Sequence, residues 1–290
     1  MARMHRDEID ISQALVRHLL EEQFPKWGEL PLRRIEPEGT DNAIFRLGDD
    51  LSVRLPRREG PTRPGGKELE WLPKLAPLLP VDVSVPVAQG RPTERYPWFW
   101  EIHTWVKGAS TPVEGIDTIQ AARDLCELIA SLQAIDPTDG PRGRGIPLAE
   151  RDEEIRYWFA RFEGDSAARE EWDRALAARP WDGPPRWHHG DLDVRNWLLR
   201  EGRIAGVIDW GSMGVGDPAC DIMVAWKLHS AGARDVFREK LQVNDATWER
   251  ARGWALSQAV AILAYYTPEN NPVLFCEAES WLELVLSERT

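Results

Sequence analysis

A short loop and the hairpin that follows it carry the residues best suited to chemistry. The segment His189–Asn196 reads His-Gly-Asp-Leu-Asp-Val-Arg-Asn, so a carboxylate, Asp191, precedes a carboxamide, Asn196, within one loop. Further on, an apolar run ends in Asp209, and the turn residues 201–202 (Glu-Gly) predict a hairpin that brings its two ends together. The three polar side chains could then share one site. Phosphoryl transfer requires such a set, a base for the acceptor hydroxyl and oxygen ligands for a magnesium ion that bridges phosphates.

Three motifs in this part of the chain resemble the catalytic core of the aminoglycoside phosphotransferase family, which has the protein-kinase-like fold. They are HGDxxxxN, I-D-x-G and GDPxxD, and they occur in the order of the family at His189–Asn196, Ile208–Gly211 and Gly216–Asp221. The resemblance extends over residues 9–286. It implies a kinase that transfers the γ-phosphate of ATP or GTP to a hydroxyl of a small molecule.

The resemblance also implies a role for each motif residue. Asp191 would orient and deprotonate the acceptor hydroxyl, while Asn196 and Asp209 would coordinate Mg²⁺. Three further residues would support the loops rather than do chemistry, by holding backbone groups: His189, Asp217 and Asp221. For Asp221, an ordinary helix or loop cap is an equally good explanation, because a cap and this role are physically alike.

The phosphate-binding residues of the nucleotide site are less clearly marked. A protein kinase places a lysine on its third strand and pairs it with a helix glutamate. Here the run 51–56 offers Arg54 at that place, and Glu68 opens the following helix, with Glu70 as the rival partner. Arginine can bind phosphate and carboxylate oxygens through two N–H groups, so the replacement is chemically sensible. Two unrelated surface charges are the alternative explanation.

Two other segments are expected to contact the nucleotide. Residues 38–43 lie where a turn should cover the phosphates, but they hold a single glycine, so the phosphate motif is weak and a plain turn is equally plausible. Residues 103–108 form the expected hinge, where backbone groups would meet the purine. The residues expected to make these contacts are Thr40, Asn42, Trp105 and Val106.

Hydrophobic spacing predicts an α+β chain with two lobes, and the family resemblance implies that these lobes form the protein-kinase-like fold. Residues 1–105 should form a nucleotide-binding lobe of mixed strands and a helix, and residues 106–290 a mainly helical lobe that carries catalysis and substrate binding. The first lobe is predicted to contain helices at 9–20 and 67–79 and strands at 32–37, 43–47, 51–55, 86–90 and 98–105. The second is predicted to contain helices at 116–135, 151–162, 167–178, 245–266 and 272–286.

Composition narrows the class of protein and of partner. The chain has 290 residues, of which 42% are hydrophobic, which is typical of a packed globular protein. Its formal net charge of −12 disfavours nucleic acid and anionic membranes as partners. The charged N-terminal residues and the lack of a long apolar run predict a cytoplasmic protein without a signal peptide or membrane span. The three cysteines form no CxxC pair and are expected to be buried thiols.

The acceptor is the part that the sequence determines least. The resemblance implies an aminoglycoside or another hydroxylated antibiotic, with macrolides as the nearest rival, and kinases of this fold also act on choline, homoserine and sugars. Asp193 is expected to face the substrate, because it follows the base by two positions. Acidic residues late in the chain could line a pocket for a polycation or form a solvated face: Glu269, Glu277 and Glu279. Aromatic residues that could form an apolar wall for a macrolide are Trp158, Tyr265 and Tyr266.

Two other function classes fit parts of the same pattern. A metal-dependent hydrolase could use His188 and His189 with nearby carboxylates, but adjacent residues of a strand point to opposite faces. A nucleotide-binding pseudokinase without catalysis is favoured only by Arg54 in place of lysine. The oligomeric state has no signature in the sequence.

Overall fold

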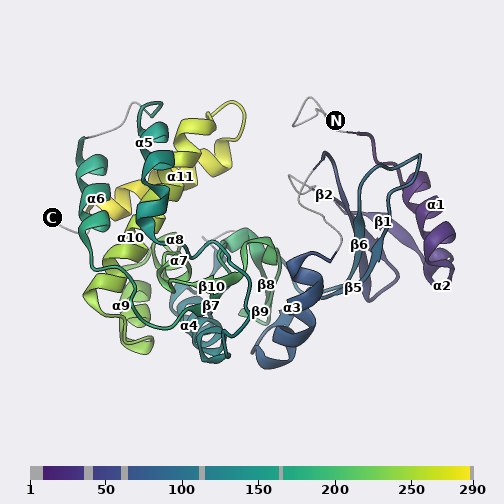
Figure 1. The fold of residues 1–290 in the computed structure, drawn as a ribbon, viewed down its shortest axis with the longest axis horizontal. Coiled ribbons are helices and arrows are strands. Elements are labelled where there is room, and N and C mark those ends of the chain that lie inside the picture. Colours follow the sequence, from purple (N-terminus) through teal and green to yellow (C-terminus); the bar gives the residue numbers. More distant parts are fainter. Residues whose placement is uncertain (1–8, 36–41, 60–64, 111–114, 163–165, 288–290) are drawn as a thin grey trace. The chain divides into compact units, whose positions relative to one another are not determined.

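A computed structural model describes residues 9–35, 42–59, 65–110, 115–162 and 166–287 (Figure 1). The chain forms two compact units. The first comprises Met1–Leu78, Asp82–Lys107 and Gly206–Ile208, and the second comprises Leu79–Val81, Gly108–Ala205 and Asp209–Thr290.

The first unit is built on an antiparallel sheet with the strand order β1-β2-β3-β6-β5. Strand β2 alternates half-buried and buried residues along its whole length, as expected when one face of a sheet meets the core. The bounds of the strands are β1 Leu32–Arg34, β2 Asn42–Leu47, β3 Leu51–Pro56, β5 Pro86–Gly90 and β6 Trp100–Thr104.

Helix α1 (Gln13–Gln23) covers the core side of this sheet through Val16, Leu19 and Leu20, which pack with Phe45 and other strand residues. Ser12 caps the helix by accepting a hydrogen bond from Leu15 N at 3.2 Å. The helix therefore starts later than the predicted residue 9. The short helix α2 (Pro25–Gly28) follows directly, with its proline in the first turn, where the missing N–H is harmless.

Helix α3 (Lys67–Leu75) packs beside β5 and continues as the 3₁₀ turn η1 (Ala76–Leu78). The two-residue strand β4 (Asp82–Val83), which the sequence did not predict, pairs in parallel with the end of β9 (Arg203–Val207). These last residues of β9 therefore belong to the first unit.

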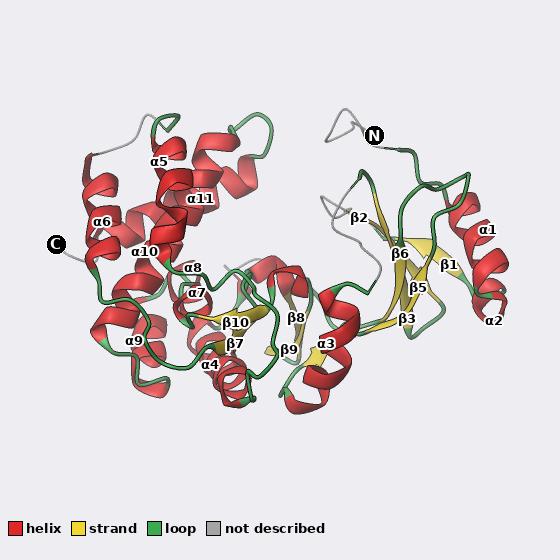
Figure 2. Ribbon diagram, in the orientation of Figure 1, coloured by secondary structure: helices red, strands yellow, loops and turns green. Residues whose placement is uncertain are grey.

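The second unit is mainly helical, and α10 (Asp245–Tyr265) runs through its core with α11 (Pro272–Ser287) and α6 (Ser166–Ala177) packed along it (Figure 2). Buried residues occur all around α10, which is typical of a core helix. The other helices are α4 Thr118–Ala134, α5 Asp152–Phe159, α7 Ala219–Ile222, α8 Val224–Lys227 and α9 Ala231–Lys240.

Short strands in the second unit position the motif residues. Strand β7 (Arg186–His188) pairs antiparallel with β10 (Gly214–Gly216), and β8 (Trp197–Arg200) forms the predicted hairpin with β9. The hairpin turn has positive φ at both central residues, 55° at Glu201 and 76° at Gly202, as a type I′ turn requires. Each motif thus begins where one of these strands ends.

Two composition-based expectations are resolved by the described residues. Cys126 and Cys220 are buried, but Cys276 on α11 is exposed, so the expectation of three buried thiols is wrong at that position. Among the helices of the described ranges, none has the length and apolar character of a membrane span.

Candidate active site

The second residue of the loop that follows β7 is a glycine at a position that does not accommodate a side chain. Gly190 has a φ of 84°, and a Cβ built there would lie 2.5 Å from the carbonyl oxygen of Ser212 and 3.1 Å from Cβ of Arg144. A side chain would therefore be strained by the backbone conformation and would also collide with the neighbouring loop. The close approach of Arg144 depends on this missing side chain.

Asp221 holds the start of the loop from behind. One carboxylate oxygen accepts a hydrogen bond from His189 N at 2.8 Å, and the other accepts one from Gly190 N at 2.7 Å. Burial raises the pKa of Asp221 to about 6, although the two N–H groups act in the opposite direction. The carboxylate thus fixes two consecutive amides immediately before Asp191.

Asp191 is held at its backbone and at its side chain. Its N–H donates to His189 Nδ1 at 3.1 Å, and its carbonyl accepts from Asn196 Nδ2 at 3.0 Å. Arg144 Nη1 donates to Asp191 Oδ1 at 2.9 Å, and about one third of each of these two side chains is exposed. The backbone contacts join the two ends of the loop, because Asn196 lies in the 3₁₀ turn η4 (Val194–Asn196) that closes it.

Asp209 follows β9 directly and begins the 3₁₀ turn η5 (Trp210–Ser212). Its φ of 64° and ψ of 65° lie in the left-handed region, which is uncommon for a residue with a Cβ. The side chain is exposed. Asp209 is therefore accessible to solvent at the start of this turn.

The expectation that Asp193 faces the substrate is wrong. Its side chain is 4% exposed, and its two oxygens meet Lys227 Nζ at 2.9 Å and Arg195 Nε at 2.6 Å. Burial alone would raise the pKa of Asp193, but the two cations hold it well below its ordinary value. Asp193 therefore stabilises the loop from within, and its charge is already neutralised.

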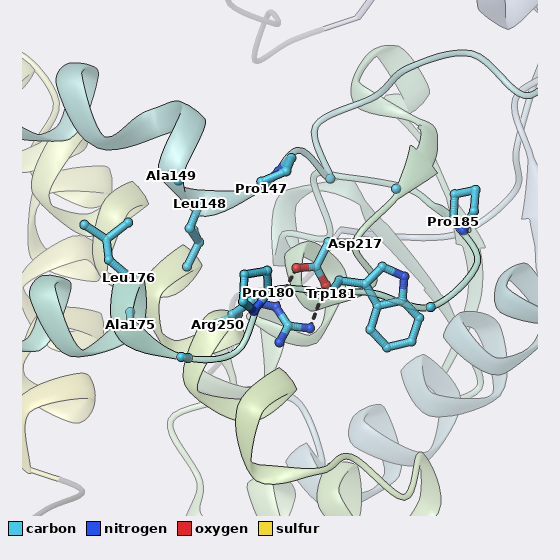
Figure 3. A pocket seen from close by; sticks show the side chains of 14 residues that line it. Pro147, Leu148, Ala149, Ala175, Leu176, Pro180, Trp181, Pro185, Asp217 and Arg250 are labelled. Carbon is cyan, nitrogen blue, oxygen red and sulfur yellow. Dashed lines mark hydrogen bonds and ion pairs between the residues drawn. The ribbon is translucent and has the colours of Figure 1, made fainter.

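Asp217 lies in a second buried ion pair. Arg250 of α10 donates to it through Nε at 2.6 Å and Nη2 at 3.1 Å, and Ala219 N donates to it at 3.0 Å. The pair forms one wall of a pocket of about 240 Å³ whose other sides include Pro180 and Trp181 (Figure 3). Within the described part of the chain, Asp217 is the one motif aspartate that lines this mostly apolar pocket.

The nucleotide residues expected in the first unit have the following surroundings. Arg54 on β3 is half-buried, donates to Ser84 Oγ at 3.0 Å and stands opposite Glu101 in the sheet register. Glu101 accepts a hydrogen bond from His103 at 2.9 Å, and burial together with nearby Arg54 lowers the pKa of His103. Arg54 thus belongs to a polar cluster that includes Glu101 and His103 of the neighbouring strand β6. No sequence signal indicated this cluster.

The other residues that were expected to contact the nucleotide differ in their burial and in their hydrogen bonds. Glu68 lies half-buried in the first turn of α3, whereas the rival Glu70 is exposed and pairs with Lys74 on the helix surface. Trp105 N donates to Asp50 O at 2.8 Å, so this N–H is not available to a purine. Val106 is buried and Asn42 begins β2; Thr40 lies outside the described residues.

The residues of the second unit that were expected to contact the substrate form an acidic group and an aromatic group. Glu269 is fully exposed in the turn between α10 and α11, and Glu279 is exposed on α11. Tyr266 directly follows α10, and its ring lies 4.8 Å from that of Tyr265, whose ring in turn lies 6.5 Å from that of Trp158 on α5. The aromatic residues expected to form a wall are therefore brought together.

Comparison with known proteins agrees with these motifs. The model of the phosphotransferase enzyme family APH matches residues 32–254, which is most of the chain. The chain belongs to this family. It is accordingly a kinase-type phosphotransferase enzyme, and the family expected from the three motifs is confirmed. No curated protein sequence matches the chain.

Solved structures of phosphotransferases share the fold over nearly the whole chain. The GDP complex of aminoglycoside 2'-phosphotransferase-IIIa is 17% identical with a TM-score of 0.69, over 97% of this chain and 100% of that one. Macrolide 2'-phosphotransferase MphH from Brachybacterium faecium is 23% identical with a TM-score of 0.63, over 92% and 97%. The streptomycin–ATP–APH(2")-IIa ternary complex is 16% identical with a TM-score of 0.60, over 94% and 99%. The likeness confirms the α+β protein-kinase-like fold.

The histidine pair next to the family motif does not form a metal centre in the described residues. His188 Nε2 accepts a hydrogen bond from Gly145 N at 3.0 Å, and His189 Nδ1 accepts one from Asp191 N. Across the ranges that the structure describes, no three His, Cys, Asp or Glu side chains gather as metal ligands would. Both rings instead hold backbone amides, which is a structural use of an imidazole.

Sequence reasoning missed the basic residues that pair with the motif aspartates: Arg144, Lys227 and Arg250. Each comes from a segment far from the motif that it contacts, so no spacing pattern links them. The one available signal was the cluster of glycines around Arg144, since Gly143 and Gly145 flank it and glycines often mark a close approach of two backbones.

Proposed function

We propose that this phosphotransferase transfers the γ-phosphate of ATP or GTP to a hydroxyl of a small molecule, with Asp191 as the base. The proposal rests on one observation: hydrogen bonds fix Asp191 at its N–H, its carbonyl and one carboxylate oxygen, yet about one third of its side chain stays exposed. Phosphoryl transfer depends mostly on such positioning, because the reaction asks little covalent chemistry of the protein. Asp191 would accept the hydrogen bond, and then the proton, of the acceptor hydroxyl.

The residues proposed to hold Mg²⁺ fit that ion. Asn196 uses its amide nitrogen to bind the Asp191 carbonyl, which leaves the amide oxygen as a possible ligand, and Asp209 offers an exposed carboxylate. Oxygen donors of this kind are what Mg²⁺ prefers in proteins. When bound, the ion would neutralise charge on the outer phosphates. His189, Asp217 and Asp221 would maintain the loops around these ligands.

The nucleotide is proposed to bind mainly through residues 1–105, and residues 106–290 would supply catalysis and the acceptor site. Arg54 would contact the phosphates with Glu68 as its helix partner, and Thr40 and Asn42 would cover them. For the purine, the carbonyl of Trp105 and the backbone of Val106 remain the proposed contacts. Solved relatives that carry GDP, ADP or ATP support a nucleotide donor without deciding between the two bases. A reaction that consumes such a nucleotide fits a cytoplasmic location.

The acceptor is proposed to be a hydroxylated antibiotic, an aminoglycoside in the first instance. Solved relatives bound to kanamycin, streptomycin or gentamicin support this class, as does the net charge of −12. A macrolide is the second candidate, and one observation favours it. Tyr265 is 57% exposed beside Trp158 and Tyr266, and an exposed aromatic group is what an acceptor with an apolar face would contact.

The test is transfer from ATP or GTP, with Mg²⁺, to kanamycin, streptomycin, erythromycin, choline, homoserine and glucose, followed by mass spectrometry of each acceptor. Asp191→Ala should abolish transfer and keep nucleotide affinity, measured by calorimetry. Asp235→Ala is the matched control, since it removes an exposed aspartate of α9 outside the motifs. Transfer that survives in Asp191→Ala would exclude this residue as the base. Nucleotide binding without transfer to any acceptor would favour the pseudokinase.

The same assay separates the two antibiotic classes. If the aromatic group forms the acceptor wall, Trp158→Ala should lower kcat/KM for erythromycin and leave the kinetics with kanamycin unchanged. If aminoglycosides are the acceptors, kanamycin should be phosphorylated and Trp158→Ala should have no effect on its kinetics.

A further inference from the structure

Arg144 is held firmly although it lies in a loop. Residues 141–145 run along β10, and backbone hydrogen bonds occur on both sides of the arginine. These bonds are Val215 N to Pro141 O at 2.8 Å, Arg144 N to Ser212 O at 3.0 Å and Asp217 N to Gly145 O at 2.8 Å. The backbone that carries Arg144 is thus tied to the turn that follows Asp209 and to the start of the GDPxxD motif.

Glycines allow this segment to lie in direct contact with the strands. A Cβ on Gly143 would come within 2.6 Å of Gly214 N, and one on Gly145 within 2.6 Å of His188 Cε1. A Cβ on Gly216 would come within 2.0 Å of the Gly145 carbonyl oxygen. The segment therefore lies in direct backbone contact with the strands, and its hydrogen bonds hold the backbone of Arg144 close to the loop that carries Asp191.

The guanidinium group of Arg144 compensates two negative charges. It binds Oδ1 of Asp191 at 2.9 Å and lies close enough to the buried Asp221 to lower its pKa, whereas Asp191 raises it. The charge of Arg195 also interacts with that of Asp191. Within the described residues, Oδ2 of Asp191 has no hydrogen-bond donor of its own.

We propose that Arg144 is a positioning residue for the reaction, which fixes the carboxylate of Asp191 in one rotamer and leaves Oδ2 for the acceptor hydroxyl. The inference rests on the proposed function of Asp191 as the base. Because Asp191 is already held at its backbone, the added contact at Oδ1 removes the remaining freedom of the side chain. Arg144 itself need not touch the acceptor.

The kinetic test compares Arg144→Met with Arg142→Met in the full-length protein, using ATP or GTP with Mg²⁺ and whichever acceptor of the panel is phosphorylated. Arg142 is the matched control, because it lies in the same segment but pairs with Glu150 on the surface. Methionine keeps much of the aliphatic stem in both cases. Loss of the positioning contact should lower kcat about 10- to 100-fold, as small misplacements of catalytic groups do. KM for the acceptor and for the nucleotide should change less than threefold, and Arg142→Met should behave as the unmodified protein.

Arg144→Lys should recover part of the lost kcat, since an ammonium group can still bind one carboxylate oxygen but lacks the rigid fork of arginine. An Arg144→Met enzyme with unchanged kcat would overturn the inference while leaving Asp191 as the base. A loss of kcat equal to that in Arg142→Met would also overturn it, because it would reflect the segment and not the contact.

A double-mutant cycle in denaturant unfolding tests the contact without any activity. The cycle uses Arg144→Met, Asp191→Asn and the double variant. A contact between partly exposed charges should couple the two substitutions by roughly 2- to 5-fold in the unfolding equilibrium constant. Coupling in a protein that transfers no phosphate would mean that the proposed function fails while the contact exists. Absence of coupling would overturn the inference whatever the activity.

Discussion

Lys227→Met removes one half of a buried ion pair and offers a sharp test of how the loop is stabilised. Lys227 Nζ lies 2.9 Å from Asp193 Oδ2, and both side chains are 4% exposed. The same ammonium group lies 4.7 Å from the ring centroid of Trp281 on α11. Methionine has a similar length and no charge. The substitution therefore leaves the packing nearly intact but removes the ammonium group that pairs with the carboxylate of Asp193.

The magnitude follows from what remains around Asp193. Removing one partner of a buried ion pair typically costs about 3–5 kcal/mol of unfolding free energy, because an uncompensated charge stays buried. Here Arg195 still donates to the other oxygen at 2.6 Å, which reduces the penalty. We expect a loss of about 2–4 kcal/mol at pH 7. Solvent screening does not weaken this interaction, because both side chains are deeply buried.

The dependence of this loss on pH has a definite sign. Lys227 and Arg195 hold the pKa of Asp193 below its ordinary value despite its burial, so the pair contributes stability above the unfolded pKa, near 4, and loses it as pH falls further. Without Lys227, only Arg195 opposes the effect of burial, so the pKa of Asp193 should rise. The buried carboxylate can then take up a proton in mild acid, so the destabilisation should be smaller at pH 4.5 than at pH 7.

The assay is urea unfolding followed by tryptophan fluorescence and circular dichroism, with midpoints compared at constant slope. Lys74→Met is the matched control, because Lys74 also pairs with a carboxylate and lies over a tryptophan ring, but its side chain is 56% exposed. The control should cost at most about 1 kcal/mol. A loss in Lys227→Met no larger than that of the control, or one that grows as pH falls, would refute the reasoning.

Two further predictions concern residues that support the loops. Gly216→Ala should destabilise the second unit by about 2 kcal/mol or more in urea unfolding, because its Cβ would lie 2.0 Å from the Gly145 carbonyl oxygen. For comparison, a Cβ at Gly202 would have no atom within 4 Å, so Gly202→Ala should cost about 1–2 kcal/mol from its positive φ alone. For Asp221, the raised pKa of about 6 means that the folded state binds the proton more tightly, so the free energy of unfolding should fall by about 2 kcal/mol as pH rises from 4 to 6.5. Asp221→Asn should flatten this limb, and an unchanged pH profile in that variant would contradict the assignment.

Elements with a clear period or a clear turn signal were predictable from the sequence. The amphipathic segment 116–135 is α4, from Thr118 to Ala134, and the predicted hairpin around Glu201–Gly202 is present. The family motifs follow the ends of β7, β9 and β10, as expected for loops that carry function. These features depend on neighbours in sequence, so local rules are sufficient for them.

Several elements of two to four residues were not predicted, because a period cannot be recognised over such lengths. Strands β4, β7 and β10 and helices α7 and α8 belong to this group. Their stability comes from partners remote in sequence: β7 exists through its register with β10, in which Trp187 pairs with Val215. The contacts of Arg144 and Lys227 were not predicted for the same reason. Arg144 binds a carboxylate 47 positions away, and Lys227 binds one 34 positions away.

Burial distinguishes aspartates that the motifs present as equals. Asp193, Asp217 and Asp221 are each at most 5% exposed, and each is held by cations, by backbone N–H groups or by both. Asp191 and Asp209 keep exposed carboxylate surface. A carboxylate already neutralised in the interior cannot reach an acceptor or a metal ion without breaking its pair, which would cost several kcal/mol. The buried aspartates therefore fix the loops, and the two aspartates that remain accessible to solvent are the ones that fit the roles proposed for the base and the metal ligand.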